Sequence, residues 1–204
     1  MPKNNYDKLV TPIGVSQYAW LTKPDTQFDP DGHYKVNLIL DTDKAQDVIN
    51  KIEANVKKAM ANAKEKVKGK AVKAAPTPYF EQLDESDEPT GKTVFKFKTK
   101  AQITTKDGTL IPNRVALFDS AGVPLTDTNV WSGSEMKVSA ELIPYYTAMA
   151  GAGVSLRLRA VQITKLVEGG NGNAKGYGFG EEDGYKLETF ENVSSDETVS
   201  EEDF

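Results

Sequence analysis

Short runs of alternating apolar and polar residues recur through the first 167 residues and restrict this chain to a fold built mainly from half-buried strands. The clearest runs are "HYKVNLIL", "TVFKFKTKAQI" and "GVSLRLRAVQITKLV". In each of them one face is apolar and the other carries polar or basic side chains. The residues expected on the inner face are Tyr34, Val36, Leu38, Leu40, Phe95, Phe97, Ala101, Ile103, Val154, Leu156, Leu158 and Ala160.

One segment departs from this alternation, because its apolar residues return every three or four positions. They are Ile49, Ile52, Val56, Ala59, Met60, Ala63 and Val67. This spacing predicts an amphipathic helical insertion at about residues 43–74, with Asp41, Thr42 or Asp43 as N-cap. The following stretch, "AAPTPYFEQLDESDEPTGK", has three prolines and an acidic run and reads as a long loop.

The order of elements is therefore strands, one long helix and more strands, which indicates an all-β fold with one inserted helix. A five-stranded Greek-key barrel of the OB type fits this order, although strand patterns alone leave other small barrels open. The Asp107–Gly108 pair between two strand-like runs predicts a hairpin.

The composition changes after Val167. Residues 168–180 are glycine-rich and read as a flexible linker, and residues 181–204 read as a disordered acidic tail. The tail has ten acids and one lysine, a net charge of −9, so residues 1–180 have 20 acids and 24 bases, a net charge of +4. A mildly basic body with an acidic tail is typical of nucleic-acid-binding proteins. Within that body, we expect residues 1–167 to form the folded domain.

Composition and motifs exclude most kinds of catalytic site. The chain has no cysteine and a single histidine, His33, which argues against a metal site. No phosphate-binding loop is present, and the glycines of "GGNGNAKGYGFG" have no flanking strand and helix to hold a cofactor. No run of apolar residues is long enough to span a membrane. We therefore expect no enzyme, no cofactor and no membrane association.

Lys96, Lys98 and Lys100 alternate with apolar residues and would place three positive charges about 6.5 Å apart along one strand face. Such a row suits a phosphate backbone, and Arg157 and Arg159 on another strand strengthen this interpretation. A solvated outer face or a protected edge strand is the alternative.

Exposed rings are the second requirement for binding unstacked bases. Tyr145 and Tyr146 stand together after Pro144, and only one of them can face the core of an extended chain. Trp20 stands in "QYAWLTKPD", at the expected end of a strand, with Lys23 close by. Packing of these rings inside the barrel remains the alternative.

The acidic tail allows three interpretations, which are solubilising disorder, a docking peptide, or a mimic of nucleic acid that occupies the basic groove. Its last four residues combine charge with an apolar anchor that carries the terminal carboxylate. They are Glu201, Glu202, Asp203 and Phe204.

Taken in order, "YAWLTKPD", "GHYKVNLIL", the long helix, "PYFEQLDE", "TVFKFKTKA", "SEMKVSAELIPYYTAMAGAGVSLRL" and the closing "EEDF" resemble the single-stranded DNA-binding proteins of T-seven-type phages. The resemblance implies an OB-fold protein that coats single-stranded DNA without sequence preference during replication, recombination and repair, and that promotes annealing. It also implies a possible homodimer, an acidic tail that contacts the phage DNA polymerase and primase-helicase, and a location in the cytoplasm of the infected host.

The resemblance maps two family DNA contacts onto Lys98 and Tyr145. Ser139 and Thr147 stand where the family archetype has a lysine and a tryptophan. Part of the groove therefore has to be rebuilt from other side chains. The full set of expected DNA-binding residues is Lys98, Tyr145, Lys96, Lys100, Arg157, Arg159, Tyr146, Trp20, Lys23 and Lys137. Two rival functions are a protein-interaction scaffold that acts through its tail and an RNA-binding OB protein, with an unidentified hydrolase as a remote third.

Overall fold

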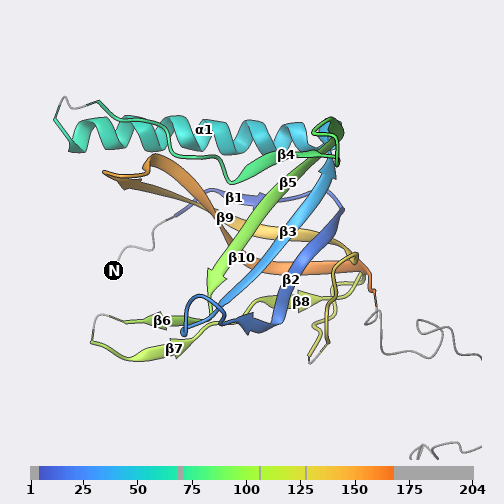
Figure 1. The fold of residues 1–204 in the computed structure, drawn as a ribbon. Coiled ribbons are helices and arrows are strands. Elements are labelled where there is room, and N and C mark those ends of the chain that lie inside the picture. The colour runs from blue at the N-terminus through green and yellow to red at the C-terminus, as the bar shows by residue number, and fades with distance from the viewer. Residues whose placement is uncertain (1–4, 69–70, 106, 127, 168–204) are drawn as a thin grey trace, which may run out of the picture. The chain divides into compact units, whose positions relative to one another are not determined.

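The computed structural model describes residues 5–68, 71–105, 107–126 and 128–167 of the chain (Figure 1). The expected linker and acidic tail lie outside the described residues. The elements are β1 (Lys8–Val10), β2 (Gly14–Asp25), β3 (His33–Asp41), α1 (Thr42–Lys66), β4 (Tyr79–Leu83), β5 (Pro89–Lys100), β6 (Gln102–Thr104), β7 (Leu110–Pro112), β8 (Ala116–Phe118), β9 (Glu135–Thr147) and β10 (Gly151–Lys165).

Five strands close into a barrel. β2 pairs with β3, β3 with β5, β5 with β10, β10 with β9, and β9 returns to β2. The pairing of β5 with β10 is parallel, while the other four pairings are antiparallel. This closed order is that of an OB barrel, and it confirms the all-β fold with one inserted helix.

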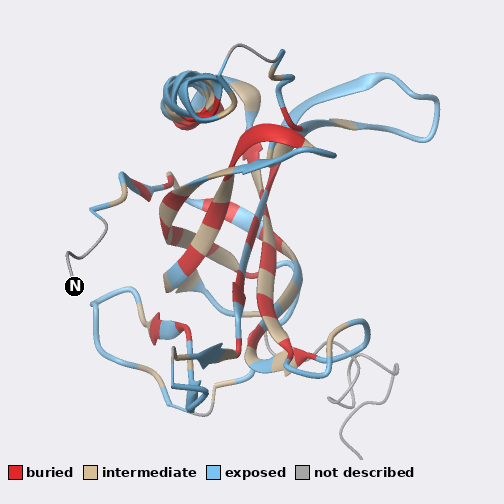
Figure 2. Cartoon of the chain, turned by 90° about the vertical axis from the view of Figure 1, so that its left-hand side faces the viewer, coloured by how far each residue is buried: buried red, intermediate tan, exposed pale blue. Residues whose placement is uncertain are grey.

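The barrel interior is filled by the inward residues of the alternating runs (Figure 2). Val36, Leu38, Phe95 and Phe97 are at most 1% exposed. Burial of these side chains contributes about 1.5–3 kcal/mol each before the entropy cost of ordering them. The period-two pattern was therefore a sound guide to the core of β3 and β5.

Two of the expected inner residues are not where the alternation puts them. In β10, two residues oppose one residue of β9 between Leu158 and Ala160. This irregularity turns Ala160 away from the core and brings Val161 and Ile163 in. Ile103 is 48% exposed, because β5 ends before it and β6 pairs only with β7. That two-stranded hairpin is the one indicated by the Asp-Gly pair.

Helix α1 lies across one end of the barrel and contacts β3, β5, β9 and β10 (Figure 1). Its inner face is made of Ala45, Val48, Ile52, Ala59 and Ala63. It ends at Lys66, earlier than the expected insertion, and Val67 is its C-cap. No helix among the described residues could cross a membrane.

The stretch expected as a long loop contains strand β4, which pairs with β5 along the side of the barrel. Its Tyr79 ring lies 5.7 Å from the ring of Phe95. The acidic run forms only the turn into β5, where Asp84 accepts hydrogen bonds from the backbone of Ser86 and Glu88. The prolines and acids of the stretch flank the strand. They dominate its composition and led to the prediction of a loop, although the aromatic residues between them favour a strand.

Candidate nucleic-acid interface

A row of outward side chains crosses the barrel from strand to strand. Trp20 on β2 lies opposite Lys35 on β3, Lys35 opposite Lys98 on β5, Lys98 opposite Arg157 on β10, and Arg157 opposite Glu141 on β9. Directly paired residues share a face of the sheet. The pairing therefore aligns three cations that are far apart in the sequence, and we name Lys35, Lys98 and Arg157 the cation row.

Carboxylates neutralise both ends of the cation row. The ammonium group of Lys35 pairs with Asp25, and this hydrogen bond lowers the pKa of the Asp25 carboxyl group, so that Asp25 stays ionised near neutral pH. The Arg157 guanidinium donates from Nε and Nη2 to Glu141 Oε2, at 3.0 and 2.7 Å. It also lies 5.2 Å from the centre of the Tyr6 ring. Both ends are thus held in place by neighbours.

Lys98, the middle residue, has no ion pair or hydrogen bond to its ammonium group within the described part of the chain. Like charges on directly opposed strands destabilise a sheet. An unpaired lysine between two other cations therefore costs stability, and an anionic ligand would offset that cost.

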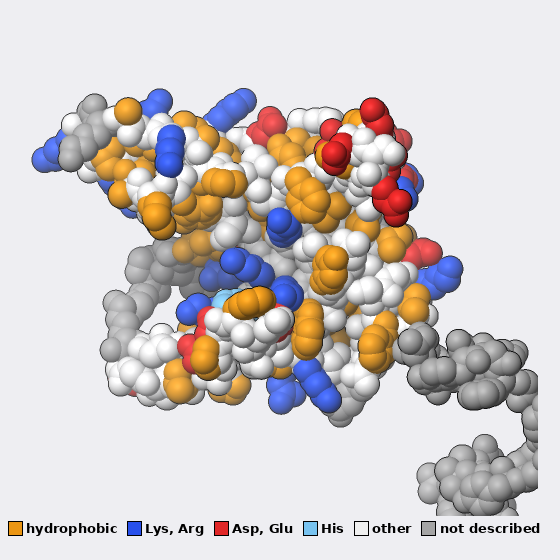
Figure 3. Space-filling model, viewed as in Figure 1, with side chains coloured by type: hydrophobic (Ala, Val, Ile, Leu, Met, Phe, Trp, Pro, Cys, Tyr) orange, Lys and Arg blue, Asp and Glu red, His pale blue; other side chains and the backbone are white. Residues whose placement is uncertain are grey.

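 Two adjoining hollows flank this lysine. One, with a volume of about 380 Å³, is lined by Lys35, Lys96, Lys98 and Tyr145 with Pro76 and Pro78. The second, of about 580 Å³, is lined by His33, Lys98, Lys100 and Arg157 among others. Lys98 and Ser155 line both hollows, so the two hollows form one continuous groove, which we name the lysine groove. Figure 3 shows Lys and Arg side chains gathered around this region beside His33.

Tyr145 is the member of the tyrosine pair that faces the lysine groove, while Tyr146 does not line it. The Tyr145 ring packs across Gly153, its direct partner on β10. A Cβ atom added at Gly153 would lie 3.0 Å from Tyr145 Oη and 2.8 Å from the Cβ of Ala75. The missing side chain therefore creates the space in which the ring lies.

We expect Gly153→Ala to displace the Tyr145 ring and to lower affinity for single-stranded oligo-dT by about fivefold, less than full loss of a stacked base. Fluorescence anisotropy of a labelled strand measures this. In a Tyr145→Ala background the same change should have little further effect, because the group it displaces is absent. Equal losses in both backgrounds would show that Gly153→Ala acts through the fold instead.

A β-bulge in β2 determines which way Trp20 points. Gln17 lies opposite Asn37 and Trp20 opposite Lys35, so three steps along β2 match two along β3. Without the extra residue Ala19 would lie opposite Lys35, and Trp20 would point into the barrel. Tyr18 in the bulge has a φ of 52°, which is a strained conformation for a bulky residue. Trp20 thus lies within β2, not at a strand's end as the sequence suggested.

The structure brings together only part of the expected DNA-binding set. Lys96, Lys98, Lys100, Tyr145 and Arg157 line the lysine groove. Of the others, Arg159 lies 3.9 Å from Glu141, Lys23 and Trp20 line a cleft beyond β3, and Lys137 lines a separate pocket with Val10 and Phe118. Glu201, Glu202, Asp203 and Phe204 lie outside the described residues.

Sequence reasoning missed Lys35, Ser155 and the carboxylates that hold the cation row. Lys35 could have been found, since it is on the polar face of "HYKVNLIL". Glu141 and Asp25 could not, because their contacts with Arg157 and Lys35 depend on strand register. Within the described residues no three or more His, Cys, Asp or Glu side chains are grouped so that they could hold a metal ion.

We expect Glu141→Gln to release Arg157 for phosphate binding. Affinity for oligo-dT should rise by a few fold at low salt, and the slope of log affinity against log salt should steepen by about 0.7, the value for one more phosphate contact on a single strand. Glu135→Gln is the matched control, because Glu135 pairs with Lys165, which lines neither hollow. An unchanged slope would mean that the pairing with Glu141 does not withhold Arg157 from phosphate.

Comparison with known proteins shows the family to which this chain belongs. The model of a family described as single-stranded DNA-binding protein, bacteriophage T7, matches residues 13–166. The chain belongs to this family. Its members are non-enzymatic binders of single-stranded DNA, so the expected binding of single-stranded DNA and the expectation of no enzyme are both confirmed. A comparison with curated proteins finds no match.

Solved structures agree with this assignment. The single-stranded DNA-binding protein gp2.5 of bacteriophage T7 is 28% identical, with a TM-score of 0.69, over 90% of this chain and 100% of that chain. The single-stranded DNA-binding protein of bacteriophage Enc34, in complex with single-stranded DNA, is 16% identical, with a TM-score of 0.59, over 79% of this chain and 88% of that chain. At that identity the second likeness concerns the fold alone.

Proposed function

We propose that single-stranded DNA lies in the lysine groove, with its phosphates against the cation row and a base stacked on Tyr145. The observation that carries this proposal is the ammonium group of Lys98, which has no partner among the described residues and lies in the same hollow as the Tyr145 ring. A phosphate satisfies that cation, and a nearby ring holds an unstacked base.

Such contacts read the backbone and the faces of bases rather than their edges. Phosphate contacts carry no direct sequence information, and stacking tolerates any base. The protein should therefore bind single strands of different sequence with similar affinity and bind duplex DNA much more weakly, since duplex bases are already stacked.

Titration of a labelled oligo-dT at several salt concentrations tests this proposal. Affinity should fall steeply with salt, with a slope of about −0.7 for each phosphate neutralised. A duplex of the same length is the control. Equal affinity for both forms would contradict stacking in the groove, and a matching titration with oligo-U tests a preference for RNA.

We further propose that the acidic tail competes with DNA and binds replication proteins. Residues 181–204 carry a net charge of −9 and end in Phe204, while the lysine groove is positive. Charge complementarity supports competition, and the family resemblance supports contacts with the phage DNA polymerase and primase-helicase.

A chain that ends at Gly180 should bind oligo-dT about tenfold more tightly at low salt, because a competing anion is gone, and the gain should vanish at high salt. Phe204→Ala should keep DNA affinity but weaken pull-down of the polymerase. Unchanged or weaker DNA binding by the truncated chain would contradict the competition.

We also propose that the protein promotes annealing of complementary strands and acts in phage replication, recombination and repair in the cytoplasm of the infected host. We propose in addition that it forms a homodimer. The neutralised backbone of a coated strand supports annealing, because it lowers the repulsion between two strands. The rate of annealing of two complementary oligonucleotides, with and without protein, checks this activity, and sedimentation checks the homodimer.

A further inference from the structure

The chain has two tryptophans, and both line one cleft at the end of the cation row. Trp20 is 43% exposed and Trp131 is 52% exposed. The cleft has a volume of about 240 Å³, below the roughly 300–1,000 Å³ of ordinary small-molecule sites. We name it the tryptophan cleft. Its size suits one flat ring.

Trp131 is held in a loop that several hydrogen bonds fix in place. Its carbonyl oxygen accepts from the Oγ atoms of Ser16 and Ser134, at 3.3 and 2.8 Å, and from the Ser134 backbone N–H at 3.2 Å. At the start of the loop, Thr22 Oγ1 donates to the carbonyl oxygen of Thr128 at 2.5 Å. An exposed indole on a fixed loop is preorganised, which lowers the entropy cost of binding a ligand.

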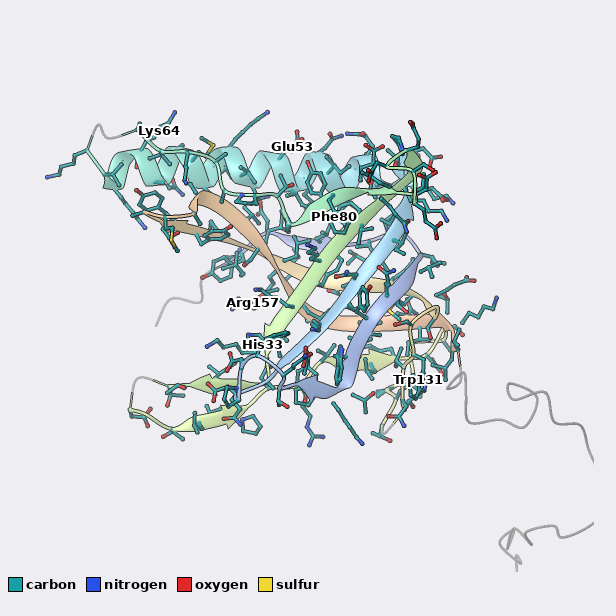
Figure 4. All side chains as sticks on the ribbon, in the orientation of Figure 1. His33, Glu53, Lys64, Phe80, Trp131 and Arg157 are labelled. Carbon is teal, nitrogen blue, oxygen red and sulfur yellow. The ribbon has the colours of Figure 1, made fainter. Side chains whose placement is uncertain are left out.

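The tryptophan cleft continues the lysine groove. Trp20 lies directly opposite Lys35, two strands and about 10 Å from Lys98. The bulge at Tyr18 is what turns the Trp20 ring to this face. In Figure 4 the labelled Trp131 and Arg157 lie on opposite sides of β2 and β3. Arg157 is the far end of the cation row, and the tryptophan cleft lies beyond its Lys35 end.

The remaining residues of the tryptophan cleft suit nucleic acid. Lys23 contributes a cation for a phosphate, and Thr22 and Asn129 offer polar groups for base or sugar. None of the described residues that line the cleft is acidic. The cleft therefore presents two rings and a positive charge without a repelling carboxylate.

We propose that the tryptophan cleft is a second stacking subsite, in which Trp20 and Trp131 hold a base of the same single strand after it leaves the lysine groove. This inference rests on the proposed path of DNA across the cation row. It assigns Trp131 a direct contact with DNA and extends the bound strand across β2. OB folds bind about 4–16 nucleotides, so one strand can occupy both places.

Tryptophan emission tests this subsite directly, because each Trp→Phe change leaves a single indole as reporter. Trp20→Phe leaves only Trp131, and Trp131→Phe leaves only Trp20. A 16-nucleotide oligo-dT should quench both reporters, each with the same half-saturation as the anisotropy of the labelled strand.

The outcomes separate this inference from the proposed function. If anisotropy shows saturation of Trp20→Phe by DNA while Trp131 emission stays constant, the second subsite is refuted and the lysine groove stands. If labelled DNA does not bind at all, the proposed function itself fails.

Affinity gives an independent check. Trp131→Ala should lower affinity for the 16-nucleotide strand by about 5- to 150-fold, the range for one stacked base, with the salt slope unchanged. Trp131→Phe keeps a ring and should lose less. Equal affinity of Trp131→Ala and the parent chain would overturn the inference.

Discussion

Tyr145→Ala should lower affinity for oligo-dT by about 5- to 150-fold, while the slope of log affinity against log salt stays the same. Base–aromatic stacking contributes about 1–3 kcal/mol per base, which converts to this range. The salt slope counts phosphate contacts, and the phenol ring makes none. Anisotropy titrations at four salt concentrations measure both quantities in one series.

The matched control is the neighbouring tyrosine. Tyr146 is on the same strand, but it does not line the lysine groove. We expect Tyr146→Ala to lose far less affinity than Tyr145→Ala. A larger loss from Tyr146→Ala would mean that Tyr146 and not Tyr145 stacks on the base, and it would place the DNA on the other side of β9.

Lys98→Glu should lower affinity by about 25-fold at 0.1 M salt and reduce the salt slope by more than 0.7. One phosphate contact with a slope of about 0.7 amounts to roughly fivefold between 1 M and 0.1 M salt, and reversal of the charge adds a repulsion of similar size. Lys98→Ala should lose about fivefold. The difference between the two variants should shrink as salt is raised, because screening weakens both effects.

Lys92→Glu is the control for the charge change. Lys92 is on the same strand, six residues and about 20 Å away, beside the acidic turn between β4 and β5. It changes the net charge equally but lies outside the lysine groove. Similar losses from both variants would mean that overall charge, not the groove, determines affinity.

The two predictions separate the two kinds of contact that the groove combines. The flanking members of the cation row are paired with Asp25 and Glu141, so they are held in place but partly neutralised. Lys98, which has no ion pair in the described part of the chain, is the member of the cation row with most to gain from a phosphate. Lys96 and Lys100 also have no carboxylate partner among the described residues, but they lie opposite Asn37 and His33, whereas Lys98 lies between Lys35 and Arg157. We therefore expect Lys98 to matter more than either of them.

Much of the fold could be predicted because it depends on local pattern. Residues two apart in a strand share a face, so alternation was enough to assign the buried side of β3 and β5. The three-four spacing identified α1 for the same reason. The prediction failed at Ala160 and Ile103, where a bulge and a strand end broke the period, and neither leaves a mark in composition.

The site could be predicted only in part. Lys98, Tyr145 and Arg157 were found from their residue types and strand faces, and from the family resemblance. Trp131 was missed, because it follows no strand pattern and its partner Trp20 is more than a hundred residues earlier. The segments that come together to form the cleft are far apart in the sequence.

The sequence by itself determined the class of fold, the polar and apolar faces of its main strands, the basic body with its acidic tail, and the family. The tertiary structure alone decided which outward residues meet: the cation row, the carboxylates that hold its ends, the ring over Gly153 and the two tryptophans in one cleft. The physical reason is that faces follow from a local period of two, whereas cross-strand partners follow from register. A single extra residue, such as the one at the Tyr18 bulge, moves the side chains that follow it to the other face until the register shifts again.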